Sequence, residues 1–383
     1  MKKILVLNNK YKILGGEDSN INEEIKLLNK KFIVQYLEFD NSKKMNLFDF
    51  FSLFTNSNYL SNKKILNEIN LFKPDVVYIH NLWFKANLGI FKILKKNKIN
   101  ALVKIHNFRY YCASSYSIKK HLKSETICKA CNLSSKYKIF NKYYEESYFK
   151  SYFLIRYIKK YLKILTTQDL KVLCITNFHK LFLLDSGVDK EKLKLYSNPI
   201  EIKNVKNKTK LSQSKYVVYA GRISEEKGIN ELIDAWNDIS NNSMILRIYG
   251  TGPLQTKLSK KYSSSNVVFF GEVENNVVLD AIANARAVIT ATKIYEGQPR
   301  LLCEASSLGV PSIFPLFGGM VEFFPEDYIF SFNQNDHKDL VKKIELLKNI
   351  EVLESEGRRV QEFLFNKLNT EKLLSDFEQY LLG

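Results

Sequence analysis

Short, almost uninterrupted apolar runs recur along the chain, separated by segments long enough to form helices. Runs that are hydrophobic throughout, without alternation, are typical of parallel strands covered by helices on both faces. In the first half they lie at Ile4–Leu7, Phe32–Leu37, Asp75–Ile79, Ala101–Ile105 and Val172–Ile175. In the second half they lie at Tyr216–Ala220, Met244–Tyr249, Val267–Phe270, Ala287–Ala291, Pro311–Phe314 and Tyr328–Phe332. The pattern predicts an α/β protein with two doubly wound, Rossmann-like domains.

Polar segments mark the expected domain borders. Residues 1–200 form the first domain, the charged stretch 201–214 a linker, and residues 215–365 the second domain. Helical patterns close the chain at about 336–349 and 351–382. We expect the last helix, 366–383, to pack back toward the first domain.

Composition excludes several classes of protein. With 383 residues, 45% of them hydrophobic, the chain has material for two cores and is neither disordered nor a small disulfide scaffold. No run approaches the roughly 18 apolar residues of a membrane span. The N-terminal run resembles a strand more than a signal peptide. Five cysteines, an odd number, fit a reducing cytosol.

Positive charge is concentrated in one half of the chain. Residues 1–200 hold 36 basic and 16 acidic side chains, whereas residues 201–383 hold 22 and 24. Only 8 of the 58 basic residues are Arg, so biased codon usage could inflate Lys, but it would not spare the second half. The first half therefore indicates an anionic partner: a membrane surface, a lipid-linked diphosphate or a nucleic acid.

The stretch 143–161 combines eight aromatic residues with interleaved lysines and an arginine. Such a helix can lie in a lipid headgroup layer, with its rings buried and its amines on anionic lipid. It can equally pack its rings on the core and leave a solvated lysine edge. The sequence leaves both interpretations open.

The segment from Tyr295 to Ala305 carries the strongest chemical signal. Glu296 lies on a loop after a predicted strand, and Glu304 lies just inside a helix that we expect to begin at about residue 300. Ionised carboxylates bind sugar and ribose hydroxyls well, and helix N-termini favour phosphate. A capped loop–helix junction with no ligand would look the same.

Two further loops follow predicted strands. Gly221–Gly228 carries Arg222 and Lys227 at the start of a helix, where a diphosphate would find two cations. Ile248–Leu254 contains Gly250 in a Gly-x-Gly turn that lacks the third glycine of a dinucleotide fingerprint. Alone, either loop is compatible with an ordinary strand-to-helix turn.

Together and in this order, these stretches resemble the retaining glycosyltransferases of family 4, of the bacterial surface-polysaccharide type. The likeness is strongest over residues 215–325 and implies a GT-B fold with its active site in a central cleft. By that resemblance Arg222 and Lys227 hold the donor diphosphate, Glu304 binds the ribose and Glu296 binds the transferred sugar. The implied donor contacts also include Gly250, Val273, Gly297, Gln298, Pro299, Arg300 and Leu301, with Gly318, Gly319 and Glu322 on a neighbouring loop. Gln298 and Arg300 replace the apolar residues usual in the family, which leaves the sugar open.

The first half agrees with this resemblance. Gly15 and Gly16 resemble the family's glycine loop beside the donor phosphate, although a plain turn remains an alternative. His106 matches a histidine that faces the donor sugar, and His80 is a second strand-end histidine with a weaker claim. Cys112, Cys128 and Cys131 could bind zinc, but Tyr143 stands where relatives often carry a further Cys, and free thiols are favoured.

The sequence thus predicts a metal-independent, retaining hexosyltransferase without a cofactor. His106, Glu296, Arg222 and Lys227 would act in catalysis, and no Asp-x-Asp occurs in the chain. A UDP- or GDP-sugar would be the donor, and a lipid-linked oligosaccharide of capsule, O-antigen or a related surface glycan the acceptor. We expect a cytoplasmic protein, peripheral on the inner face of the plasma membrane, with no nucleic-acid partner. The alternatives are a nucleotide-sugar- or nucleic-acid-binding protein without transferase activity, and a GT-B epimerase or phosphorylase.

Overall fold

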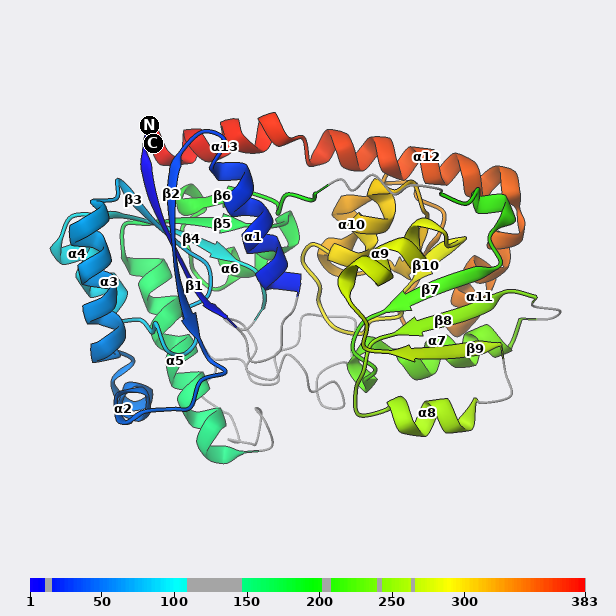
Figure 1. Ribbon diagram of the computed structural model, residues 1–383, viewed down its shortest axis with the longest axis horizontal. Helices are drawn as coiled ribbons and strands as arrows, with labels where there is room; N and C mark the ends of the chain where they lie inside the picture. Colours follow the sequence, from blue (N-terminus) through cyan, green and yellow to red (C-terminus); the bar gives the residue numbers. More distant parts are fainter. Residues whose placement is uncertain (11–15, 109–146, 202–207, 240–242, 263–265, 383) are drawn as a thin grey trace. The chain divides into compact units, whose positions relative to one another are not determined.

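The computed structural model describes residues 1–383 except 11–15, 109–146, 202–207, 240–242, 263–265 and 383. The chain divides into two compact units (Figure 1). Unit 1 contains the described residues up to Pro199 and those from Leu368 onward, and unit 2 contains Ile200–Lys367. No helix within the described ranges is long and apolar enough to cross a membrane.

Unit 1 is a six-stranded parallel sheet with the order β2-β1-β3-β4-β5-β6. Its strands are β1 (Lys3–Lys10), β2 (Ile33–Asp40), β3 (Val76–Ile79), β4 (Asn100–Ile105), β5 (Lys171–Cys174) and β6 (Leu193–Leu195). Helices pack around it: α1 (Gly16–Leu28), α2 (Leu47–Thr55), α3 (Tyr59–Phe72), α4 (Ile90–Lys96), α5 (Tyr148–Thr167) and α6 (Asn177–Asp185). The five predicted strands are confirmed, and β6 was missed.

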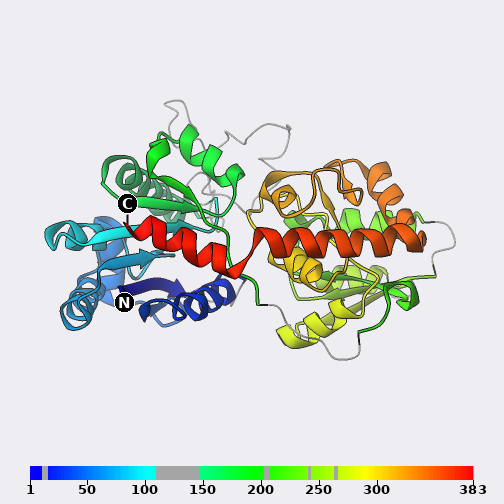
Figure 2. The same cartoon turned by 90° about the horizontal axis from the view of Figure 1, so that it is seen from above.

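The last helix, α13 (Thr370–Leu382), belongs to unit 1. Its Phe377 is fully buried, and the centroid of its ring lies 5.1 Å from that of Tyr78 and 5.4 Å from that of Tyr196. Both termini therefore lie on unit 1, where Lys2 Nζ donates to the Leu381 carbonyl at 3.3 Å (Figure 2).

Unit 2 repeats the architecture with the order β12-β11-β10-β7-β8-β9, again parallel. Its strands are β7 (Tyr216–Ala220), β8 (Ile245–Tyr249), β9 (Val267–Gly271), β10 (Ala287–Ile289), β11 (Ser312–Pro315) and β12 (Ser331–Phe332). Its helices are α7 (Ile229–Asn237), α8 (Gln255–Lys261), α9 (Asn275–Ala283), α10 (Arg300–Ser307), α11 (His337–Glu345) and α12 (Ile350–Lys367). The apolar stripe of α7 is buried, Trp236 included. The prediction of two doubly wound domains is confirmed.

The end of the predicted linker packs on unit 2. Leu211 is buried in a short 3-10 helix, Thr209 Oγ1 donates to Asn284 Oδ1 at 2.8 Å, and the Arg286 guanidinium donates to the Ser214 carbonyl at 3.2 Å. Residues 208–214 are therefore packed against unit 2 and are not a free connection. They hold this position through hydrogen bonds to Asn284 and Arg286 and through the buried Leu211 side chain.

Candidate active site

Parallel sheets of this kind bind ligands outside the carboxyl ends of their strands, at the point where the strand order reverses. In unit 2 that point lies between β7 and β10, because the chain proceeds outward from β7 through β8 to β9, and from β10 through β11 to β12. The loops that leave these two strands carry Arg222, Lys227 and Glu296. The sequence-predicted residues are therefore brought to the place where the fold favours a ligand.

An ion pair joins the two loops. The Lys227 ammonium donates to Oε1 of Glu296, and both side chains are 27% exposed, which leaves them accessible to a ligand. The backbone of Glu296 is fixed as well, since its carbonyl accepts from the N–H of Gly319 at 2.9 Å. The loop after β11 thereby fixes the backbone that carries the Glu296 carboxylate.

Arg222 lies on the same edge with its side chain exposed. Its carbonyl accepts from the Tyr219 hydroxyl at 2.9 Å, which anchors the loop backbone. Burial, with added repulsion from Glu226 and Glu296, raises the pKa of Tyr219 above its ordinary value, so this hydroxyl keeps its proton. Within the described ranges no carboxylate forms an ion pair with the Arg222 guanidinium, which leaves it available to an anion.

Glycine is required where the first loop enters α7. Gly228 has φ +66°, and a Cβ there would lie 1.9 Å from the carbonyl oxygen of Ala291. This contact presses the start of α7 against the chain that leaves β10. The positive end of the α7 helix dipole therefore points to the same edge as Lys227.

Backbone packing also explains Gly250 after β8. It has φ +118°, and a Cβ on it would lie 2.1 Å from the Gly221 carbonyl oxygen. The predicted donor contact of Gly250 stays a prediction, because this close packing by itself requires a glycine. Val273 is half-buried between β9 and α9.

The second acid, Glu304, lies on α10 in an ion pair that sequence reasoning did not predict. Its Oε1 accepts from Nε of Arg300 at 2.8 Å, and its side chain is 8% exposed. Of the flanking predicted residues, Gly297 and Pro299 are buried and Leu301 is half-buried. Gln298 hydrogen-bonds the Cys303 thiol, whose pKa burial raises above its ordinary value. Arg300 thus sits directly on the carboxylate that the resemblance assigns to the ribose.

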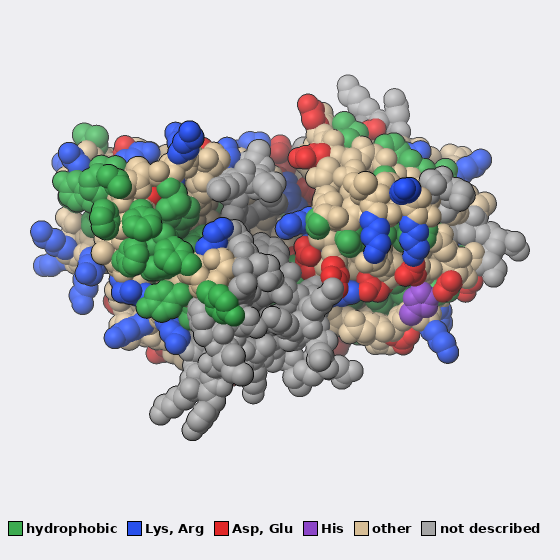
Figure 3. Space-filling view, turned by 90° about the horizontal axis from the view of Figure 1, so that it is seen from below, with side chains coloured by type: hydrophobic (Ala, Val, Ile, Leu, Met, Phe, Trp, Pro, Cys, Tyr) green, Lys and Arg blue, Asp and Glu red, His purple; other side chains and the backbone are tan. Residues whose placement is uncertain are grey.

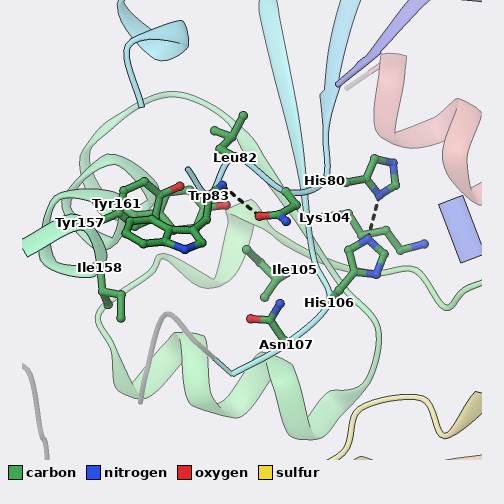
Figure 4. A pocket seen from close by; sticks show the side chains of 11 residues that line it. His80, Leu82, Trp83, Lys104, Ile105, His106, Asn107, Tyr157, Ile158 and Tyr161 are labelled. Carbon is green, nitrogen blue, oxygen red and sulfur yellow. Dashed lines mark hydrogen bonds between the residues drawn. The ribbon is translucent and has the colours of Figure 1, made fainter. Parts of the chain in front are cut away.

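Unit 1 has its own reversal point, between β1 and β3. Beside it, His80 follows β3 and His106 follows β4, and Nδ1 of His80 lies 2.8 Å from Nε2 of His106 (Figure 4). The two rings stack with a centroid distance of 5.0 Å. His106 Nδ1 is buried and has no hydrogen-bond partner among the described residues. Sequence reasoning gave His80 little weight, and its proximity to His106 appears only in the fold.

Burial, together with neighbouring positive charge on Lys104, lowers the pKa of His80 well below 6.5. Burial also lowers the pKa of His106, with smaller contributions from His80 and Lys104. Both rings are therefore neutral near pH 7, and one of the two facing nitrogens donates while the other accepts.

A buried ion pair lies beneath the histidines. Lys104 Nζ donates to Glu24 Oε2 at 2.8 Å, and their side chains are 0% and 1% exposed. The Tyr78 hydroxyl donates to the other oxygen of Glu24 at 2.5 Å, and the Tyr78 ring packs on His80 at 4.4 Å. The cluster links α1, β3 and β4. In the sequence, its only signal is the position of Lys104 within an apolar run.

A pocket opens next to the histidine pair, at the carboxyl ends of β3 and β4 and against α5 (Figure 4). Trp83 and Tyr157 in its lining pack edge to face, with ring centroids 4.7 Å apart. The lining comprises His80, Asn81, Leu82, Trp83, Lys104, Ile105, His106, Asn107, Tyr157, Ile158 and Tyr161. Its aromatic residues were not predicted as a site.

The remaining predicted residues are less informative. Gly16 is the first residue of α1, whereas Gly15, Cys112, Cys128, Cys131 and Tyr143 lie outside the described residues. Cys174 and Cys303 are buried free thiols. Among the described side chains, no cluster of three or more His, Cys, Asp or Glu could hold a metal ion.

Comparison with known proteins relates the second half of the chain to a family. Residues 201–361 match the family described as glycosyl transferases group 1. Unit 2 is thus similar to group 1 glycosyl transferases over most of its length. Its matched range contains the reversal point with Arg222, Lys227 and Glu296.

Relatives and solved structures agree with this likeness. The capsular polysaccharide biosynthesis glycosyltransferase CapM of Staphylococcus aureus is 26% identical over 202 residues, 50% of this chain and 52% of that protein. The amylovoran biosynthesis glycosyltransferase AmsD of Erwinia amylovora is 26% identical over 123 residues, which are 31% of this chain and 35% of the AmsD chain. The chain thus spans about half or less of these relatives. The fold of Anabaena Alr3699/HepE, crystallised with UDP and glucose, matches with TM-score 0.72 and 14% identity over 100% of this chain and 99% of that one. The GT-B fold expected from the sequence is confirmed by this likeness.

Proposed function

We propose that the protein is a retaining glycosyltransferase that moves a hexose from a nucleotide-sugar to a saccharide acceptor. One observation carries the proposal: Lys227 and Glu296 pair across the reversal point of the unit 2 sheet, and Arg222 is exposed on the loop after β7 at the same edge. A nucleotide-sugar presents a diphosphate next to a ring of hydroxyls. Two cations and a carboxylate on one edge match both parts.

The chemistry follows from the charges. As the glycosidic bond to phosphate breaks, negative charge builds on the departing diphosphate, and preorganised cations stabilise it. Arg222 and Lys227 would supply these cations, so we propose that no metal ion is needed. Glu296 would accept hydrogen bonds from sugar hydroxyls, since an ionised acceptor forms strong ones. Glu304 would bind the ribose, and His106 would contact the sugar.

The likeness to HepE, which was crystallised with UDP and glucose, supports a nucleotide-sugar donor. The named functions of CapM and AmsD support a polysaccharide acceptor in capsule or related glycan synthesis. The pocket beside His80 and His106 is the candidate acceptor site, because it offers aromatic faces and polar groups together.

We further propose that the acceptor is lipid-linked and is used in the cytoplasm at the inner face of the plasma membrane. The net charge of +20 in residues 1–200 supports this, since a lipid diphosphate and an anionic leaflet both attract it.

A donor screen tests the proposed function. Purified protein is incubated with UDP-, GDP- and ADP-sugars, with and without EDTA, and release of nucleoside diphosphate is followed. We expect release from one donor, resistant to EDTA and lost in Glu296→Ala and Arg222→Ala, with Lys342→Ala on exposed α11 as the matched control. If no donor is hydrolysed or transferred and none shifts the melting temperature, the proposal is wrong.

A further inference from the structure

Helix α2 has its polar side inward and its apolar side outward. Its buried residues are Asp49 and Ser52, whereas Leu47 is 74% exposed and Phe51 is 60% exposed. Phe48, Phe50 and Phe54 are exposed as well. A surface helix of a soluble protein normally shows the reverse arrangement.

This orientation is fixed by the sequence. Asn46 caps the helix in a reciprocal capping box with Asp49, and Asn56 ends it with φ +53°. Inside, Oδ1 of Asp49 accepts from Nδ2 of Asn58 at 2.8 Å. Because each inward polar group is bonded to the chain, rotating the helix to bury its rings would break the cap and leave the Asp49 carboxylate without its hydrogen-bond partners.

The apolar side of α2 continues onto α3 and α5. Phe48 packs on Tyr59 of α3 with centroids 5.7 Å apart, and Phe54 packs on Phe153 of α5 at 4.8 Å. Phe153 also contacts Phe149, which is 53% exposed. The surface, here termed the aromatic patch, comprises Met45, Leu47, Phe48, Phe50, Phe51, Phe54, Tyr59, Leu60, Tyr148, Phe149 and Tyr152.

The aromatic patch holds eleven of the 22 large apolar side chains that are exposed in the described part of the chain. Contiguous apolar surface of this kind marks an interaction site, whereas scattered apolar residues do not. Figure 3 shows hydrophobic side chains gathered on unit 1 with Lys and Arg along the border.

The charge around the patch selects the partner. Helices α2, α3 and α5 together carry seven basic and two acidic side chains. Of the two acids, Asp49 is buried and Glu68 accepts from the Gln35 amide, so the outward charge is basic. A second copy of the chain would bring two basic borders together, which opposes dimerisation, whereas an anionic lipid surface complements both the rings and the border.

We infer that the aromatic patch, centred on α2, inserts into the headgroup region of an anionic membrane. The inference deepens the proposed function, because such a surface would hold unit 1 where a lipid-linked acceptor is presented. It assigns the membrane contact chiefly to α2, and only to the first turns of α5. The rest of α5 packs inward, with Phe153, Tyr157 and Ile158 buried, so the two sequence interpretations of this segment each describe part of it.

Vesicle co-sedimentation tests the inference with the full chain. Wild type is expected to bind vesicles of phosphatidylcholine with 30% phosphatidylglycerol at low salt and to bind pure phosphatidylcholine at least tenfold more weakly. Leu47→Ser/Phe51→Ser should weaken binding at least tenfold, and Lys43→Glu/Lys44→Glu/Lys150→Glu should do so at low salt only. Matched controls on other exposed surfaces, Leu181→Ser/Val277→Ser and Lys260→Glu/Lys338→Glu/Lys342→Glu, should bind like wild type.

A second measurement does not depend on the stability of the serine variant. With Trp introduced as Phe51→Trp, fluorescence should be quenched by vesicles that contain brominated lipid, beyond the quenching seen in wild type. Absence of wild-type binding, equal binding by Leu47→Ser/Phe51→Ser, or a dimer that this variant disperses would overturn the inference. Vesicle binding needs neither donor nor acceptor, so its failure would leave the donor screen unaffected, and failure of the donor screen would leave vesicle binding intact.

Discussion

Removing the negative charge of Glu24 should destabilise unit 1 strongly. Glu24→Gln keeps the shape of the side chain and an oxygen for the Tyr78 hydroxyl, but it leaves the ammonium of Lys104 buried without a counter-charge. Breaking a buried ion pair from one side costs about 3–5 kcal/mol. In a domain of this size each kcal/mol lowers Tm by about 2–4 °C, so the expected loss is roughly 6–20 °C.

The size of this stability loss depends on the desolvation of the Lys104 ammonium, which a compensating variant can test. Replacing all three polar partners, in Glu24→Leu/Tyr78→Phe/Lys104→Met, removes the buried charges and the hydroxyl together. Such replacements of buried pairs are often neutral or stabilising, so most of the loss should be recovered.

Urea unfolding followed by tryptophan fluorescence can report unit 1 separately. The chain has two Trp residues, Trp83 in unit 1 and Trp236 in unit 2. In a Trp236→Phe background the signal comes from unit 1 alone. A loss below about 1 kcal/mol in Glu24→Gln, or a triple variant less stable than the single one, would refute the reasoning.

Three further predictions concern individual side chains. Burial lowers the pKa of His179 to about 3, so the folded state does not take up the proton that the unfolded state binds near pH 6.5. The folded state therefore loses about 1 kcal/mol of stability between pH 7 and pH 5.5. The Tm of His179→Phe should fall less over that range than the Tm of wild type. Arg300→Met removes a predicted donor contact together with the ion pair that holds Glu304, so the donor KM should rise about 2- to 5-fold at constant kcat, and an unchanged KM would contradict the donor role of these two residues. His80→Phe removes the hydrogen bond that orients His106, so kcat should fall about 2- to 10-fold in steady-state assays with little change in KM, whereas an unchanged kcat would show that the bond orients nothing.

The fold was largely predictable because buried parallel strands are apolar on both faces. Strand β6 was missed because it has three residues and Lys194 lies within it. Polarity does not reveal that Thr209 and Ser214, within the predicted linker, bond to unit 2. The exposed aromatic face of α2 was not predicted, since a run of aromatic residues is typical of a buried core. Only the inward position of Asp49 shows that the rings face outward.

The site was predictable to the extent that loops after parallel strands meet at one edge. This places Arg222, Lys227 and Glu296 together without any knowledge of distances. Contacts between remote segments were not accessible, because Glu24 and Lys104 lie 80 positions apart and nothing in the local sequence couples them. The carboxylate of Glu304 was predicted, but its engagement by Arg300 depends on rotamers that only the structure shows.

The central claim is that the loops after β7 and β10 bind the diphosphate of a nucleotide-sugar. Isothermal titration of UDP and GDP tests it directly, without an acceptor, on wild type, Arg222→Gln, Lys227→Gln and the exposed control Lys342→Gln. We predict that one nucleotide binds, that each of the first two variants weakens it about tenfold or more, and that the control does not. If neither nucleotide binds, or if both site variants bind as wild type does, the claim is contradicted.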